Sequence, residues 1–155
     1  MQEKHIIYNS FDQIPADEQH LIEQAELASQ NAYAPYSKFH VGAALLLNDG
    51  NILLGANQEN AAYPSGLCAE RVAIFNCMTS FPNLKIEKIA VIARKENQGE
   101  FVSAAPCGAC RQVMLEQESK QGQPIQVIFK NGTGWIKINT ISTLLPFSFD
   151  KNVLI

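Results

Sequence analysis

Helical spacing of apolar residues occurs in two parts of the chain, and two further helices are expected. Residues 17–33 begin with acidic side chains, which suit a helix start, and then carry an apolar residue every three or four positions. Residues 68–80 have the same spacing, a third helix is expected from about Cys107 to about Ser119, and residues 141–146 are expected to form a short helix. Such stripes predict helices that bury one face. The first two stripes consist of Leu21, Ile22, Ala25 and Ala28, and of Val72, Ile74, Phe75 and Met78.

Short apolar runs outside these helices predict strands. Residues 39–47 and 51–56 flank an Asn-Asp-Gly turn sequence and are expected to pair as a β-hairpin. Residues 88–94 are rich in β-branched side chains and predict a buried strand, while residues 125–129 and 135–139 predict two more around a Gly-containing turn. Strands that alternate with helices favour one α/β sheet with helices on its faces, although the pattern leaves the strand order open.

The composition is that of one ordinary globular domain, expected to span residues 1–155, with residues 1–15 as an N-terminal extension of unknown role. The net charge is −3 and no cluster of Lys and Arg is present, which disfavours nucleic acid as a partner. A secretory signal and a membrane-spanning stretch are both lacking, so a cytoplasmic protein without a membrane partner is expected. Thiols stay reduced there, and the four cysteines therefore indicate metal ligands, redox groups or core residues.

Three of the four cysteines stand at expected helix starts. Cys107 and Cys110 are three positions apart, which places both sulfur atoms on one side of a first helical turn and suits two ligands of a tetrahedral zinc ion. Cys68 begins another helix, so two adjacent helices can bring three sulfur atoms together. Cys77 is half a turn out of phase with Cys68 and is expected to be a buried apolar thiol. Three protein ligands and an open fourth position are typical of a catalytic zinc site.

Glu70 follows Cys68 by two residues and can reach a water molecule at such a metal without binding the metal. A carboxylate in that place can take up a proton and pass it to a substrate. Cys-x-Glu followed by Pro-Cys-x-x-Cys is the signature of zinc-dependent nucleobase deaminases, here with three cysteines. Two other classes are weighed against it. A thiol redox protein would explain neither Glu70 nor Cys68, and a structural zinc module would need a fourth ligand.

The sequence resembles the small, homotetrameric cytidine deaminases. The shared stretches are "AYAPYSKFHVGAALL", "GANQENAAYPSGLCAERVAI", "APCGACRQVM" and "LLPFSF", which span nearly the whole chain from about residue 20. The resemblance implies a three-layer α/β/α sandwich with a mixed five-stranded sheet, one zinc ion per chain and a homotetramer with sites shared between subunits. It also implies hydrolytic deamination of cytidine and 2′-deoxycytidine in pyrimidine nucleoside salvage. A sister deaminase acting on a nucleoside antibiotic is the nearest alternative.

The resemblance further assigns roles to single residues. It implies that Glu70 is the catalytic proton carrier and that zinc is held by Cys68, Cys107 and Cys110. Arg71 is expected to donate hydrogen bonds to the thiolates and so to offset their negative charge. The residues expected to contact the substrate are Phe39 against the pyrimidine, Asn57 and Glu59 at the ribose hydroxyls, Ala69, and Phe149 from a neighbouring subunit.

Overall fold

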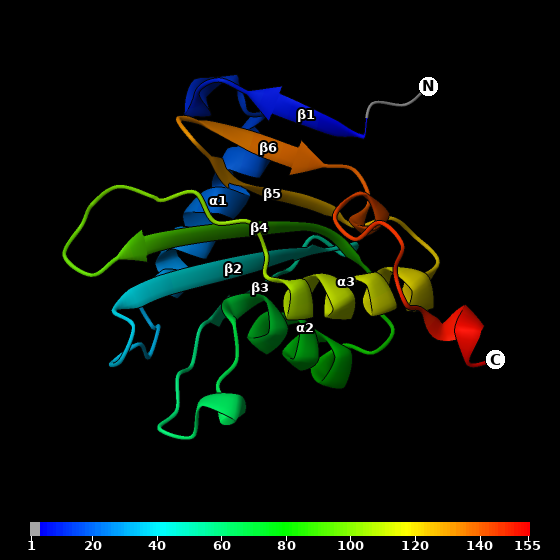
Figure 1. The fold of residues 1–155 in the computed structure, drawn as a ribbon. Helices are drawn as coiled ribbons and strands as arrows, with labels where there is room; N and C mark the ends of the chain where they lie inside the picture. Colours follow the sequence, from blue (N-terminus) through cyan, green and yellow to red (C-terminus); the bar gives the residue numbers. More distant parts are fainter. Residues whose placement is uncertain (1–3) are drawn as a thin grey trace.

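A computed structural model describes residues 4–155, which form one β-sheet with helices on both faces (Figure 1). The α-helices are α1 (Ala16–Ser29), α2 (Ala69–Ser80) and α3 (Gly108–Gln121). The strands are β1 (His5–Tyr8), β2 (Phe39–Leu47), β3 (Ile52–Ala56), β4 (Ile86–Lys95), β5 (Gln126–Asn131) and β6 (Gly134–Ile138). They are arranged in the order β1-β6-β5-β4-β2-β3. The expected α/β architecture with a mixed sheet is thereby confirmed.

The sheet has six strands, so the expectation of five is wrong. The additional strand is β1, which lies in the N-terminal segment that was expected to be an extension of unknown role. It pairs antiparallel with β6, with His5 opposite Ile138 and Tyr8 opposite Trp135. Four residues are too few for hydrophobic periodicity to reveal a strand, and its formation depends on a partner far along the chain. The N-terminal segment is therefore an integral edge of the sheet.

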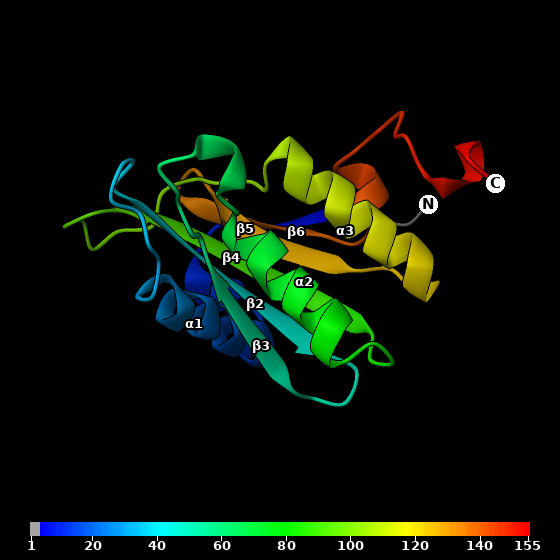
Figure 2. The ribbon, with the colours of Figure 1, turned by 90° about the horizontal axis from the view of Figure 1, so that it is seen from below.

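Strand direction explains why α2 and α3 lie side by side. Strand β2 pairs antiparallel with both β3 and β4, so β3 and β4 run in the same direction, and β5 is parallel to β4. The chain crosses from β3 to β4 through α2 and from β4 to β5 through α3, as parallel strands require. Both helices cover the same face of the sheet (Figure 2). Both therefore begin at the carboxyl ends of parallel strands, where α/β proteins commonly bind ligands.

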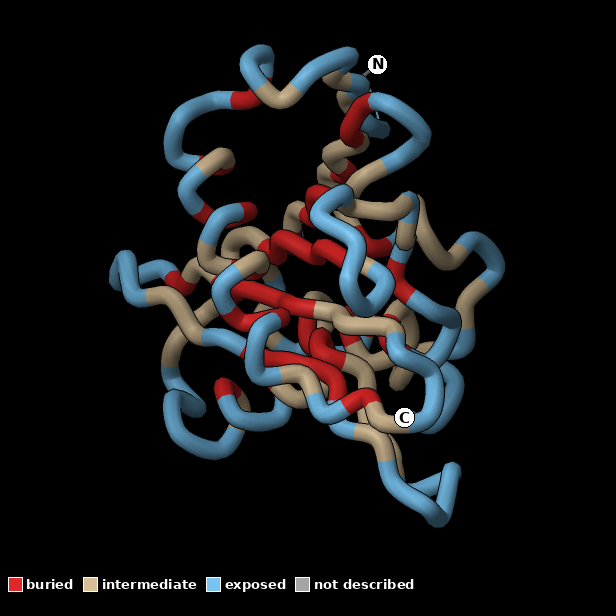
Figure 3. The backbone as a smooth tube through the Cα atoms, turned by 90° about the vertical axis from the view of Figure 1, so that its left-hand side faces the viewer, coloured by how far each residue is buried: buried red, intermediate tan, exposed pale blue. Residues whose placement is uncertain are grey.

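Each face of the sheet has its own hydrophobic cluster. Helix α1 covers one cluster through Leu21, Ile22 and Ala25, and α2 and α3 cover the other. Alternate strand residues face opposite sides, so Ala44 packs toward α1 and Leu45 packs toward α2. The buried positions are concentrated along the sheet and the exposed positions in the surrounding loops (Figure 3).

Two expected helices differ from those observed. Helix α1 ends at Ser29, because the backbone N–H of Tyr33 donates to the carbonyl of Asn57 and draws the following residues away from the helix axis. In residues 141–146 only the single 3-10 turn Ile141–Thr143 forms. The hairpin and the helices near Cys68 and Cys107 are confirmed. Within residues 4–155, no helix is long and apolar enough to cross a membrane.

Candidate metal centre and adjoining cavity

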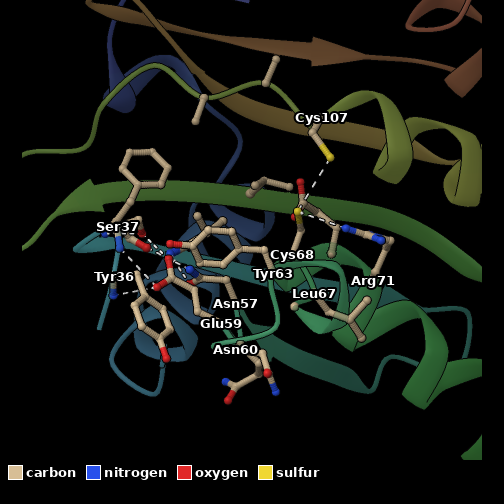
Figure 4. A pocket seen from close by; sticks show the side chains of 18 residues that line it. Tyr36, Ser37, Asn57, Glu59, Asn60, Tyr63, Leu67, Cys68, Arg71 and Cys107 are labelled. Carbon is tan, nitrogen blue, oxygen red and sulfur yellow. Dashed lines mark hydrogen bonds between the residues drawn. The ribbon is translucent and has the colours of Figure 1, made fainter. Parts of the chain in front are cut away.

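The starts of α2 and α3 bring three cysteine side chains together. Cys68 is the N-cap of α2, Cys107 is the N-cap of α3, and Cys110 lies in the first turn of α3. Their Sγ atoms all lie within 4.8 Å of one another, and those of Cys68 and Cys107 are 3.7 Å apart (Figure 4). Two sulfur ligands about 2.3 Å from a tetrahedral zinc ion would be separated by about 3.8 Å. The donor set therefore fits zinc.

The surroundings of Cys68 favour its ionised form. Hydrogen bonds from Cys110, and then from Arg71 and Cys107, lower the pKa of the Cys68 thiol to about 5. Arg71 donates from Nη2 to Cys68 Sγ at 3.5 Å. A dashed line marks this hydrogen bond in Figure 4. The pKa of Cys110 is raised, because its thiol is hydrogen-bonded to Cys68 and is buried. In the metal-free protein the cluster thus holds a thiolate and protonated thiol together, and metal binding would release protons.

Cys77 lies outside this cluster. Its side chain is buried in the hydrophobic cluster beneath α2, and burial raises the pKa of its thiol. The prediction of a buried apolar cysteine is confirmed. Among residues 4–155, the other three cysteines are the one group of three side chains placed close enough together to share a metal ion.

Glu70 is buried beside the three thiols. Its side chain is 3% exposed and stands in the first turn of α2. Burial raises the pKa of its carboxyl group to about 7, and the negative charge of Cys68 acts in the same direction. A bound cation would act in the opposite direction, so this value belongs to the metal-free protein. A carboxyl group that titrates near neutral pH can both accept and donate a proton.

A cavity of about 730 Å³ adjoins the cysteine cluster. Its lining includes the buried side chain of Glu70 and the solvent-exposed side chains of Tyr36 and Tyr63. The rings of these two tyrosines meet edge to face, with centroids 6.0 Å apart. The volume lies in the range of small-molecule sites. The full lining is Tyr36, Ser37, Phe39, Val41, Asn57, Gln58, Glu59, Asn60, Tyr63, Gly66, Leu67, Cys68, Glu70, Arg71, Val91, Ala104, Ala105 and Cys107.

Asn57 joins the cavity wall to the first residues of β2. Its Oδ1 accepts a hydrogen bond from the Val41 N–H at 2.9 Å, and its Nδ2 donates to the Phe39 carbonyl at 2.9 Å. The amide is therefore held in one orientation. One Nδ2 hydrogen and one Oδ1 lone pair remain available for a further partner.

Glu59 holds the segment that precedes β2 through hydrogen bonds. Its Oε2 accepts from the backbone N–H groups of Tyr36 at 3.0 Å and Ser37 at 3.2 Å, and its Oε1 accepts from the Ser37 hydroxyl. The hydrogen bond from the Ser37 hydroxyl is the main reason why the pKa of Glu59 lies below its ordinary value. The cavity wall therefore carries an ionised carboxylate at neutral pH.

Two expected substrate contacts, Ala69 and Phe149, lie outside this lining. Ala69 is fully buried in the first turn of α2. Phe149 is 57% exposed, and its carbonyl accepts from Gln112 Nε2 of α3 at 2.8 Å. The C-terminal segment, red in Figure 1, thus lies beside α3, away from the cavity of its own chain.

Several lining residues were not singled out from the sequence. They include Tyr36, Ser37 and Tyr63, which belong to the stretches "AYAPYSKF" and "ENAAYPSG". The available signal was the presence of tyrosines in loops rich in Ala and Pro, next to residues already assigned to the site. The contacts to Glu59 give these loops their positions, and local sequence cannot indicate such contacts.

Comparison with known proteins identifies similar sequences and folds. The sequence profile described as "Cytidine and deoxycytidylate deaminase zinc-binding region" matches residues 15–122. A cytidine deaminase from Halalkalibacterium halodurans is 43% identical over 133 residues, which cover 86% of this chain and 94% of the relative. A cytidine deaminase from Sporosarcina psychrophila is 41% identical over 138 residues, covering 89% and 95%. The crystal structure of cytidine deaminase from Burkholderia pseudomallei has a TM-score of 0.70 at 39% identity, covering 88% of this chain and 100% of that chain.

Proposed function

The chain belongs to the cytidine and deoxycytidylate deaminase family, and from this premise we propose how its own residues carry out the reaction. It is a zinc-dependent enzyme that deaminates cytidine hydrolytically to uridine with release of ammonia. Membership in this family excludes the two alternative classes, a thiol redox protein and a structural zinc module. The observation that carries the assignment of roles is the meeting of three thiols with the buried Glu70 at the wall of a nucleoside-sized cavity.

The substrate is proposed to be a free nucleoside, although the family includes enzymes for a nucleotide as well. Among the described residues that line the cavity, the one cationic side chain is Arg71, which already bonds to Cys68. The lining also contains the carboxylate of Glu59. A phosphate group usually requires Arg or Lys partners, and here it would face a like charge. Cytidine and 2′-deoxycytidine fit this wall better than their 5′-phosphates.

Glu70 is proposed to move the protons of the reaction. Cys68, Cys107 and Cys110 hold the zinc ion, which when bound supplies Lewis-acid chemistry that lowers the pKa of water. Glu70 accepts a proton from the attacking water and delivers one to ring N3, which makes C4 more electrophilic. It then takes the second proton from the hydroxyl group now on C4 and passes it to the amino group, so that the C4–N bond breaks, ammonia leaves and the C4 carbonyl of uridine forms. One carboxyl group, buried beside the metal ligands, can serve all of these steps.

The remaining residues are proposed to bind and orient the nucleoside. Phe39 packs against the pyrimidine ring, and Asn57 and Glu59 use their free hydrogen-bonding capacity on the sugar hydroxyls. Ala69 acts through its backbone N–H, which has no acceptor inside the helix because it belongs to the first turn of α2. Arg71 offsets the negative charge of the thiolates.

The working enzyme is proposed to be a cytoplasmic homotetramer in pyrimidine nucleoside salvage. Its four cysteines are free, as the cytoplasm permits. The C-terminal segment exposes five large apolar side chains, a large apolar surface for an unpartnered terminus. Phe149 of one subunit is proposed to pack against the base bound by a neighbour. The five side chains are Phe147, Phe149, Val153, Leu154 and Ile155.

Glu70→Gln tests the central assignment. We expect this variant to keep its zinc and its fold but to lose activity on cytidine by at least about 10²–10⁴-fold, because the amide cannot accept and return a proton. The loss is followed by ultraviolet absorbance, and zinc content by elemental analysis. In the same assay, 2′-deoxycytidine should react and its 5′-monophosphate should be a poor substrate.

Matched variants separate this role from general damage. Glu116→Gln removes an exposed carboxylate from α3 and should remain fully active. Cys107→Ala should lose zinc, whereas Cys77→Ala should keep it. A Glu70→Gln enzyme with a tenth of the wild-type activity would exclude the proton-carrier role, and a Cys107→Ala protein with full zinc would exclude the ligand assignment.

A further inference from the structure

Three aromatic side chains from distant parts of the chain meet at the edge of the sheet. Trp135 of β6 is 3% exposed, and the rings of Phe11 and Phe101 both contact it. Its ring centroid is 6.0 Å from that of Phe11 at a tilt of 57°, and 6.1 Å from that of Phe101 in an edge-to-face contact of 80°. Both are favourable geometries for aromatic pairs. Phe11 and Trp135 lie outside residues 15–122, which match the family profile.

The N-terminal segment holds Phe11 against Trp135. Strand β1 pairs with β6 so that Tyr8 lies opposite Trp135, and the chain then turns into the single 3-10 turn that begins at Phe11. Gly134 permits this pairing, because a Cβ atom there would lie 2.3 Å from the Tyr8 carbonyl oxygen. The segment that adds the sixth strand therefore also supplies one side of the aromatic contact.

Phe101 belongs to the connection that carries the metal ligand Cys107. Residues 96–106 join β4 to α3 as a wide loop without helix or strand (Figure 1). Beside Phe101, the Val102 N–H donates to the Ala93 carbonyl at 2.9 Å, and the Gly132 N–H donates to Ser103 Oγ at 2.6 Å. The loop is thus anchored at three consecutive residues shortly before it reaches the metal centre.

Cys107 depends on such anchors, because its own side chain is exposed. Burial holds Cys110 in place, whereas Cys107 is fixed on one side by α3 and on the other by the loop. Ala104 and Ala105, between the anchored residues and Cys107, line the cavity. A shift of the loop would therefore move a metal ligand and a part of the substrate wall together.

We propose that Phe11, Trp135 and Phe101 form an aromatic brace that positions Cys107 at the metal centre, which makes the N-terminal segment a support of the active site. The three are positioning residues and do not touch the metal or the substrate. The proposal rests on the zinc site described above. It gives a role to residues outside the part of the chain that matches the family profile.

The rate at which zinc leaves the holoenzyme to a chelator tests the brace without any assay of activity. Phe11→Leu and Phe101→Leu keep an apolar side chain but lose the ring contact with Trp135. We expect each to release zinc about 10–100-fold faster than the wild type, because losing an outer support of a metal ligand typically costs about that factor in metal affinity and the loss should appear in the release rate. Phe101→Tyr keeps the ring and should restore slow release.

Ile22→Val is the control, since Ile22 lies in the same hydrophobic cluster but outside the aromatic brace. It should lower thermal stability and leave zinc release close to that of the wild type. Trp135 is the single tryptophan of the chain, so its fluorescence emission shows whether each variant keeps it buried. If Phe101→Leu does not fold, Phe11→Leu provides the same comparison.

Two results would overturn the brace. One is a rate of zinc release that rises only in proportion to the loss of thermal stability in every variant, and the other is an unchanged rate in both Leu variants. A wild-type protein that bound no zinc would contradict the proposed metal centre instead, so the two failures are distinguishable.

Discussion

The carboxyl group of Glu70 is buried next to a thiolate, which is an unfavourable place for a negative charge. In the metal-free protein its pKa is about 7, above its ordinary value of 4.5. Between these two pH values the folded state binds more protons than the unfolded state. The stability that this group contributes is therefore complete at low pH and is lost as the pH rises through 7.

Replacement of Glu70 in the metal-free protein should show this dependence. At pH 5, just above the ordinary pKa of 4.5, we expect Glu70→Gln to exceed the wild type in stability by less than about 1 kcal/mol. At pH 8 it should be more stable by up to about 3 kcal/mol, because each unit of pKa shift corresponds to about 1.36 kcal/mol. The measurement is urea unfolding of both metal-free proteins from pH 5 to 8. The surface variant Glu116→Gln should show no such divergence, and a constant difference across the pH range would contradict the burial effect.

Two glycines allow helices to lie close to the sheet on its opposite faces. A Cβ atom on Gly42 of β2 would lie 1.8 Å from the Ala25 carbonyl oxygen of α1. One on Gly55 of β3 would lie 2.4 Å from the Ala69 carbonyl oxygen of α2. The backbone cannot yield to either contact without moving the helix. Of these two helices, α2 is the one that carries site residues, since Ala69 stands between Cys68 and Glu70 at its start.

Alanine substitutions at the two glycines should therefore differ in their effects. Both Gly42→Ala and Gly55→Ala should lower stability by at least about 1–3 kcal/mol, the range for overpacked cores. Gly55→Ala should also weaken zinc retention and activity, since it displaces the start of α2. Melting temperature, zinc content and cytidine turnover measure these effects, and the expectation fails if Gly42→Ala loses zinc as readily as Gly55→Ala.

On the scale of the whole molecule, one chain has an apolar surface that its own fold does not cover. Phe149 is exposed beside α3, and Phe75 and Phe81 are partly exposed at the outer face and end of α2. The lining of the cavity contains no residue of the C-terminal segment. A neighbouring subunit that covered these surfaces could receive Phe149 in its site, as the proposed tetramer requires.

Exchange of subunits between two inactive variants tests this sharing. Glu70→Gln lacks the proton carrier but supplies Phe149, whereas Phe149→Ala lacks the ring but keeps Glu70. Mixed tetramers should contain some sites with both groups, so their activity on cytidine should exceed that of either parent. Native mass spectrometry verifies the exchange, and each parent mixed with itself is the control. Verified exchange without a rise in activity would place Phe149 outside the neighbour's site.

Local sequence was enough to predict the chemistry of this protein. Cysteines at helix starts, a glutamate two positions after one of them and an Asn-Asp-Gly turn are features whose consequences follow from a few adjacent residues. The structure confirms the gathering of the three thiols, because α2 and α3 both start at the carboxyl ends of parallel strands. The roles proposed for the substrate contacts came from family resemblance, and the experiments above test them.

Contacts between distant residues decided the rest. The sixth strand exists because β1 finds β6 across more than a hundred residues, and helix α1 stops at Ser29 because Tyr33 bonds to Asn57. The burial that raises the pKa of Glu70 and the contact of Phe11, Trp135 and Phe101 arise only when separate elements pack together. Periodicity and turn chemistry describe neighbours along the chain, whereas pairing, burial and electrostatics depend on neighbours in space, which only the tertiary structure supplies.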